Sequence, residues 1–164
     1  MSDGSETQEV GATSDTSLCE LLTFRTFGQR YALDILEVKE IRGWTPPTPL
    51  PHARPYMSGM VNLRGLVLPV MDLARRLGLP ATPDDPRNVI IVAQVGARLH
   101  GLLVEAVADI VRVAGDAIQE APRTADDAGV GADRLLLLEG EVVQLLSIER
   151  LLPPLGRAEP DHAA

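Results

Sequence analysis

An internal repeat constrains the fold of this chain more than any other feature of its sequence. The stretch Met60 to Leu77 (MVNLRGLVLPVMDLARRL) matches Leu136 to Leu152 (LLLEGEVVQLLSIERLL), with Gly65 aligned on Gly140. A second match lies upstream of each copy, where FGQRY and VKEI in the first half correspond to VGARL and VADI in the second. Both halves follow the order strand, Gly turn, strand, apolar-acidic-apolar segment, strand, Gly turn, strand and short helix. The chain therefore reads as two related β units, each built from about five short strands.

Within the first copy, Gly65 predicts the bend of a tight β-hairpin, because glycine inside an apolar β-type run marks a turn or a close backbone approach. Pro69 has no N–H, so the second strand of this hairpin is expected to lie at an edge or to be bulged there. The short helix that follows is expected to point Leu73 and Leu77 inward and Arg75 and Arg76 outward.

The amino-acid composition argues against several classes of function. The chain has 164 residues, enough for one compact domain or two small subdomains that share a core. Aromatic residues are only 3% of the total, so the core must be built from Val, Leu, Ile and Ala, and base-stacking surfaces are not expected. The formal charge of −8 argues against binding to nucleic acid or to anionic membranes.

The ends and connections of the chain differ in composition from its body. Residues 1–16 carry Asp and Glu without Lys or Arg and predict a disordered acidic tail, and 153–164 predict a flexible C-terminal tail. Between them, 17–152 form the folded domain, with a boundary loop between the units near 78–88. The proline-rich stretch 44–55 predicts an extended connector that wraps the first unit.

The pattern of cysteine and hydropathy favours a cytoplasmic protein. Cys19 is the only cysteine, so no internal disulfide can form. The sequence shows neither a signal-peptide pattern nor an apolar run of the roughly 18 residues that a membrane-spanning helix needs.

Residues that could carry chemistry are sparse. The three histidines have no metal-ligand spacing and no nucleophile motif is present, so neither a metal site nor a cofactor is expected, and the chain is not predicted to be an enzyme. One alternative stays open: a small β-barrel enzyme in which His100 acts with Glu105 or Asp109, to be tested by loss of turnover in His100→Ala.

One polar pair stands out. Glu40 ends an apolar strand and Arg64 lies at the tip of the hairpin, and if the first unit closes into a small barrel the two come within ion-pair range. Such a pair is either a bridge that locks the fold or a rigid charged surface for a partner, and the two roles are compatible.

These residues also carry a family resemblance. YALDILEVKEIRG at 31–43, YMSGMVNLRGLVLPVMDL at 56–73, GLLVEAVADIV at 101–111 and the closing LLLLEGEVVQLLSIERLL resemble the CheW family of chemotaxis coupling proteins. The resemblance runs from about Leu18 to Leu152. It implies an all-β fold of two five-stranded SH3-like barrels packed together, with short helices at the hairpin ends, and no catalytic activity.

The resemblance further implies an adaptor that joins two partners, the cytoplasmic tip of a methyl-accepting chemoreceptor and the regulatory domain of the histidine kinase CheA. The protein would associate with membrane receptor arrays through these partners, without inserting into the membrane itself. A related kinase pathway, such as one that controls pili motility, is an alternative output.

Site residues follow from the matched motifs. The family's receptor-binding groove maps to Val38, Glu40, Arg64, Val89, Val107 and Ile110. Stiff Val and Ile side chains can form an apolar trough for a helix, while a charged pair fixes its register. Kinase contacts are assigned to Ile35 and Leu36, and structural roles to Asn62 and Gly65 of the NLRG motif and to Gly59 and Gly101.

Overall fold

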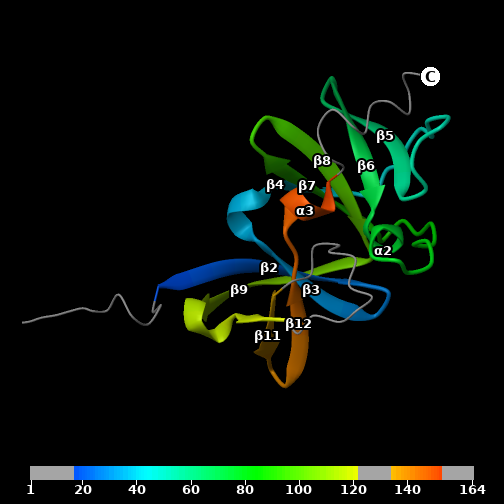
Figure 1. Cartoon of the computed structure of the whole chain (residues 1–164). Coiled ribbons are helices and arrows are strands. Elements are labelled where there is room, and N and C mark those ends of the chain that lie inside the picture. The colour runs from blue at the N-terminus through cyan, green and yellow to red at the C-terminus, as the bar shows by residue number, and fades with distance from the viewer. Residues whose placement is uncertain (1–16, 122–133, 153–164) are drawn as a thin grey trace, which may run out of the picture.

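Short antiparallel hairpins organise the chain into two sheets (Figure 1). The computed structural model describes residues 17–121 and 134–152, so the predicted tails at 1–16 and 153–164 lie outside the described residues. The six-stranded sheet has the order β10-β11-β12-β3-β2-β9 and the five-stranded sheet the order β4-β7-β8-β6-β5. The expected all-β fold is confirmed as two sheets, one of six strands and one of five.

Both halves of the chain are built from short strands with brief helical turns between them. The first half contains β2 (Leu18–Thr26), β3 (Gln29–Asp34), the 3-10 turn η1 (Ile35–Glu37), β4 (Val38–Gly43), β5 (Met57–Leu63), β6 (Leu66–Asp72) and α2 (Leu73–Arg76). The second half contains β7 (Val89–Val95), β8 (Arg98–Val104), β9 (Ala106–Ala114), η2 (Gly115–Ala117), β10 (Gln119–Glu120), β11 (Arg134–Leu138), β12 (Glu141–Leu145) and α3 (Ile148–Leu151).

Two-residue turns close four hairpins, as the glycine positions predict, and three of these turns share one backbone geometry. Arg64 and Gly65 have φ of 53° and 88°, and Phe27-Gly28 and Glu139-Gly140 show the same pair of positive values. Two consecutive residues with positive φ match the twist of the flanking strands, and glycine, which adopts positive φ without steric cost, takes the second place in each of these three turns. The Asn62 side chain accepts a hydrogen bond of 2.8 Å from the Gly65 backbone N–H and holds the turn at the tip of β5 and β6.

The two sequence repeats do not coincide with the two sheets. β2 and β3 come from the first repeat but lie in the six-stranded sheet with β9 to β12, and β7 and β8 of the second repeat join β4 to β6. β3 joins the strands of the second repeat by pairing in parallel with β12, and β8 joins those of the first repeat by pairing in parallel with β6. The first hairpin of each repeat therefore lies in the sheet that holds the remaining strands of the other repeat, and this exchange interlocks the two halves.

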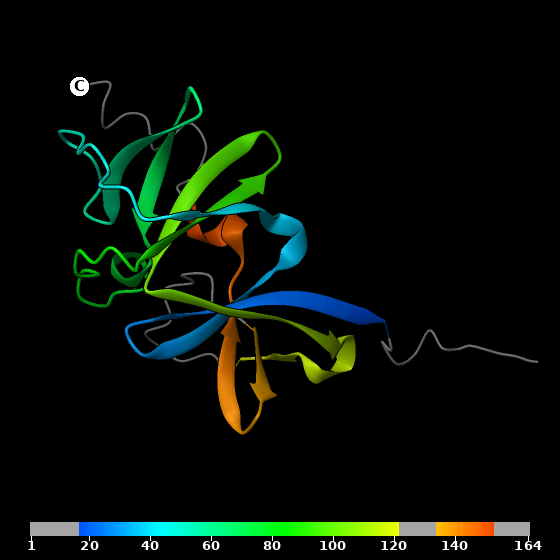
Figure 2. The same ribbon diagram turned by 180° about the vertical axis from the view of Figure 1, so that it is seen from behind.

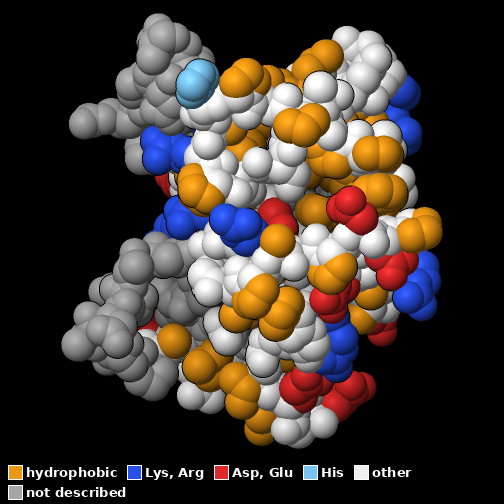
Figure 3. All heavy atoms as spheres, turned by 90° about the vertical axis from the view of Figure 1, so that its right-hand side faces the viewer, with side chains coloured by type: hydrophobic (Ala, Val, Ile, Leu, Met, Phe, Trp, Pro, Cys, Tyr) orange, Lys and Arg blue, Asp and Glu red, His pale blue; other side chains and the backbone are white. Residues whose placement is uncertain are grey.

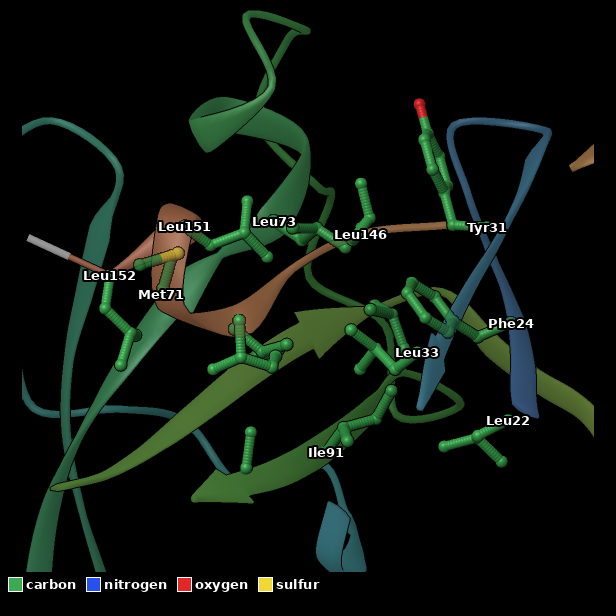
Figure 4. Close-up of a cluster of buried hydrophobic side chains, with 14 residues drawn as sticks. Leu22, Phe24, Tyr31, Leu33, Met71, Leu73, Ile91, Leu146, Leu151 and Leu152 are labelled. Atoms are coloured by element: carbon green, nitrogen blue, oxygen red, sulfur yellow. The ribbon is translucent and has the colours of Figure 1, made fainter. Parts of the chain in front are cut away.

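Three hydrophobic cores result from this exchange. One core belongs to the six-stranded sheet alone and one to the five-stranded sheet alone. The largest lies between the sheets, where Leu22 and Phe24 of β2 meet Ile91 and Ala93 of β7, and both short helices contribute leucines to it (Figure 4). This shared core holds the sheets in one fixed arrangement.

Two local expectations need correction, and the first concerns β6. This strand is not an edge strand, since it lies between β8 and β5. It pairs with β8 only from Val70 to Asp72, so Pro69 falls where one side of the strand is unpaired and its missing N–H costs no hydrogen bond.

The second correction concerns Arg76, which does not point into solvent but is half-buried and reaches the other helix. Its Nε donates to the Leu151 carbonyl at 2.7 Å and its Nη2 to the Arg150 carbonyl at 3.3 Å, while the guanidinium lies 4.9 Å from the centre of the Tyr56 ring. Arg76 thus ties α2 to the end of α3.

Within the described residues, no helix has both the length and the apolar character that crossing a membrane requires.

Candidate functional site

The edge strands of the two sheets carry apolar side chains on the faces that they turn toward the shared core. β4 ends the five-stranded sheet and β9 ends the six-stranded sheet, and both lie on the side of the molecule shown in Figure 2. We use "the seam" for five apolar side chains that these strands and the start of β7 carry on the core-facing side of the sheets: Val38, Ile41, Val89, Val107 and Ile110.

Strand register decides which side chains face the seam. Val107 and Ile110 are paired with Phe24 and Leu22, and both of these belong to the shared core. Val38 and Ile41 are paired with Ala93 and Ile91 of the same core. Directly paired residues of antiparallel strands lie on the same face of a sheet. Both edge strands therefore direct an apolar pair toward the seam.

A β-bulge in each edge strand makes this arrangement possible. In an unbroken strand Val38 and Ile41, three residues apart, would face opposite sides of the sheet. The register shifts between Val38 and Glu40, and again opposite Thr23 and Phe24, so Lys39 and Ala108 are extra residues. Each bulge turns the following isoleucine back to the same face as the valine.

The seam is accessible as well as apolar. Ile110 is 52% exposed and Ile41 is 44% exposed, large fractions for side chains of this kind. Val38, Val89 and Val107 are half-buried against the shared core. The space-filling view in Figure 3 shows hydrophobic side chains at the surface in both the upper and the lower part of the face that it displays.

The predicted Glu40–Arg64 ion pair is present, and the register places Glu40 on the face of β4 opposite Val38 and Ile41. Arg64 Nη2 and Nη1 donate to the two carboxylate oxygens of Glu40 at 2.8 and 3.3 Å. The hydrogen bonds from Arg64 lower the pKa of Glu40, and the carboxylate raises the pKa of Arg64. Glu40 is paired with Val92, which faces the core of the five-stranded sheet, so the ion pair flanks the apolar face and is not part of it.

The second repeat has a different charge arrangement at the corresponding hairpin. Glu141 binds Arg25 through two hydrogen bonds of 3.0 and 3.1 Å, and Arg30 lies 3.3 Å from Glu139 and 3.7 Å from Glu141. Hydrogen bonding to Arg25 lowers the pKa of Glu141. The acidic residues in place of Arg64 and Leu66 thus pair with the exchanged hairpin of β2 and β3.

The residues assigned to kinase contacts lie together on η1 but differ in exposure. Leu36 is 88% exposed, whereas Ile35 is half-buried against the shared core. The Asp34 side chain accepts a hydrogen bond of 2.9 Å from the Leu36 N–H and fixes this turn. Leu36 therefore projects from a rigid position.

The two structural glycines occupy crowded sites. A Cβ on Gly59 would overlap the backbone carbonyl of Thr48, which also exchanges two 2.8 Å backbone hydrogen bonds with Met60. A Cβ on Gly101 would lie 2.9 Å from Ile90 Cγ2 and 3.1 Å from Val70 Cγ2. Both positions need a residue without a side chain because a neighbouring segment comes too close.

The alternative enzyme site is not assembled by the described contacts. His100 of β8 is paired with Ala93 of β7, and the Nδ1 atom of His100 is buried without a hydrogen-bond partner. Glu105 instead accepts from the Gly28 N–H at 3.4 Å, and Asp109 accepts from the N–H of the next residue at 2.8 Å. The described part of the chain also contains no group of three or more His, Cys, Asp or Glu that could hold a metal ion.

Sequence reasoning missed Ile41 as a member of the seam. The signal was available, because the repeat aligns VKEI with VADI and so places Ile41 on Ile110. Only the bulge, which is not evident from either strand alone, shows that the isoleucine rather than the acidic residue before it shares the face of Val38.

Comparison with known proteins agrees with this architecture. The CheW-like domain family matches residues 20–154. The chemotaxis protein CheW of Rhizobium meliloti is 46% identical over 135 residues, which cover 82% of this chain and 87% of that protein. CheW of Bacillus subtilis is 31% identical over 148 residues, or 88% of this chain and 94% of that protein.

A solved structure shares the fold. The scaffolding protein TtCheW from Thermoanaerobacter tengcongensis superposes with a TM-score of 0.78 at 22% identity, over 87% of this chain and 97% of that one. At this identity the likeness bears on the fold alone. Taken with the family match over nearly all of the described residues and the sequence relatives, it leads to one conclusion: the chain belongs to the CheW-like domain family.

Proposed function

We propose that this protein is a non-catalytic chemotaxis adaptor that couples the cytoplasmic tip of a chemoreceptor to the regulatory domain of the histidine kinase CheA. The observation that carries the proposal is the family match across residues 20–154, supported by relatives named as chemotaxis proteins. The adaptor acts in the cytoplasm and reaches membrane receptor arrays through its partners.

The receptor tip binds along the seam. A helix presents apolar anchors at i, i+3, i+4 and i+7, and these fit a trough lined by Ile41 and Ile110 with Val38, Val89 and Val107 at its base. Glu40 and Arg64 are the charged pair that sets the register of the helix. Because the side chains stand on strands of two interlocked sheets, the trough is preorganised and little ordering entropy is lost on binding.

The kinase regulatory domain binds elsewhere, through exposed apolar residues that include Leu36. A leucine that is 88% exposed on a capped turn is available for burial against a partner, and Ile35 beneath it supports the turn. Since η1 directly precedes β4, this surface adjoins the Val38 end of the seam.

Replacement of seam isoleucines by aspartate tests the receptor surface. Ile110→Asp and Ile41→Asp are preferred to Val38→Asp, because Val38 also packs on the core and its loss would disturb folding. Each variant should weaken binding of a purified receptor-tip fragment by roughly tenfold or more while binding of the CheA regulatory domain is retained. Leu137→Asp, which places the same charge on an exposed leucine of β11, is the matched control.

Circular dichroism and thermal unfolding establish that each variant is folded. Unchanged receptor affinity in both folded isoleucine variants would remove the seam as the receptor surface. If the wild-type protein binds neither the receptor fragment nor the kinase domain, the proposed function itself is wrong.

A further inference from the structure

We infer that a pocket at one end of the seam, lined by both apolar and charged residues, receives a lysine or arginine side chain of the receptor helix. The inference rests on the proposed function and adds a determinant of partner choice to it. The pocket is lined by residues of the loop before β7 and of the junction between β8 and β9: Pro83, Asp85, Arg87, Asn88, Glu105 and Ala106.

The position of the pocket connects it to the seam. Asn88 directly precedes Val89 on β7, and Ala106 directly precedes Val107 on β9. Val89 is paired with Val104, the residue before Glu105, so the pocket lies where the two sheets meet. A helix that follows the seam past these valines continues over the pocket. Successive turns of a helix are about 5.4 Å apart, so one further turn brings the next side chain of the same stripe to it.

The net charge of the pocket depends on whether each of its carboxylates already has a cationic partner. Asp85 accepts three hydrogen bonds from Arg87, from its backbone N–H at 2.8 Å, from Nε at 3.2 Å and from Nη2 at 3.0 Å. These bonds lower the pKa of Asp85 and raise the pKa of Arg87, so the two charges cancel.

Glu105 is the other carboxylate that lines the pocket. Its one hydrogen bond within the described residues comes from the Gly28 N–H and is long, at 3.4 Å. A carboxylate has about four acceptor positions, so most of its capacity is unused. Among the described residues no ion pair neutralises the half-buried Glu105, so there it is the carboxylate of the pocket without a cationic partner.

A long cationic side chain fits both parts of this pocket. Pro83 and Ala106 offer apolar surface for the methylene stem of Lys or Arg, and Glu105 offers an acceptor for the charged head. An acidic side chain would be repelled by Glu105, so the pocket selects receptors with a basic residue at this place in the helix.

Binding of a receptor-tip fragment to wild type, Glu105→Gln and Glu105→Arg, measured by calorimetry at low and moderate salt, tests this assignment. We expect about threefold to tenfold weaker binding for Glu105→Gln and a loss of more than about tenfold for Glu105→Arg. The salt dependence of the affinity should decrease in Glu105→Gln, because one charge pair is gone. Glu120→Gln, an equal charge change on exposed β10, should bind like wild type.

Charge reversal on the partner identifies the occupant. Receptor fragments in which each basic helix residue is changed to Glu should include one that binds Glu105→Arg more tightly than it binds wild type. The pocket assignment is wrong if both Glu105 variants bind the fragment with wild-type affinity, or if they lose affinity only for the CheA domain. If wild type itself does not bind the fragment, both the proposed function and the pocket assignment fail.

Discussion

At the scale of single residues, His100 shows how strongly the interior of a β-sheet can disfavour a charge. The imidazole is largely buried on β8, and burial together with the neighbouring Arg98 lowers its pKa from 6.5 to about 4. Protonation would place a positive charge where Nδ1 has no acceptor. His100 is thus a neutral packing residue at neutral pH.

This burial predicts a pH-dependent stability. Below pH 6.5 the unfolded chain binds a proton at this histidine that the folded chain excludes until about pH 4, so the free energy of unfolding should fall as pH decreases through that window. In His100→Gln, urea unfolding between pH 7 and pH 4 should show a shallower decrease. His52→Gln, at an exposed position in the connector, should keep the wild-type slope. Parallel pH profiles for wild type and His100→Gln would contradict the assignment.

At the scale of elements, the connector 44–55 depends on one glycine of β5. Thr48 pairs with Met60 through two 2.8 Å hydrogen bonds, and this requires its carbonyl to pass over Gly59, whose φ is +145°. Gly59→Ala adds a methyl group into that carbonyl and also strains the backbone, so we expect a loss of roughly 2–4 kcal/mol in the free energy of unfolding.

Gly43→Ala is the control for this change. Gly43 lacks a positive φ and has open space where the added methyl group would lie, so its replacement should change stability by less than about 0.5 kcal/mol. Chemical unfolding of both variants provides the measurement. Equal stabilities for the two would mean that the connector yields readily and does not depend on Gly59.

Elements with a local cause were predictable from the sequence. Gly28, Gly65 and Gly140 mark two-residue turns because such turns need positive φ, and β4 ends at Gly43 as its β-branched run predicts. The Glu40–Arg64 pair was also predictable, since both residues belong to one repeat, Glu40 on β4 and Arg64 in the turn after β5. Turn geometry and short-range sequence repeats depend on residues that are close together in the chain, so they can be predicted from the local sequence.

Features with a long-range cause were not predictable in the same way. The exchange of hairpins depends on parallel pairing between β3 and β12, which lie more than one hundred positions apart, and no local pattern specifies it. The solvent-facing role expected of Arg76 failed for the same reason, because its acceptors belong to the other repeat. Ile41 was missed because a bulge, and not strand alternation, decides its face.

At the scale of the whole molecule, the interlocked sheets behave as one body only if the contacts between the repeats hold. The shared core supplies most of this connection, and Arg76 adds a polar one, with two hydrogen bonds to carbonyls at the end of α3. The residue aligned with Arg76 in the second repeat is Leu151. Leucine has no polar side-chain group, so this position of the second repeat cannot make equivalent hydrogen bonds to the first repeat.

Removal of this tie should loosen α3 without unfolding the sheets. Arg76→Met keeps an apolar stem of similar length and loses the hydrogen bonds, so we expect about 1–3 kcal/mol lower stability and faster amide hydrogen exchange at Leu151 and Leu152. Amides within β7 and β8 should remain protected. Arg75→Met, at the exposed neighbouring position on α2, should leave both quantities close to wild type.

The same variant separates binding from coupling in the proposed adaptor. Arg76 lies outside the seam and outside η1, so the affinities for the receptor fragment and for the kinase domain should each stay near wild type. If a change in receptor packing is transmitted through a rigid pair of sheets, receptor control of kinase activity should nevertheless weaken in a reconstituted complex. Full kinase control in Arg76→Met, with faster exchange in α3, would show that transmission does not pass through the contact between the two helices.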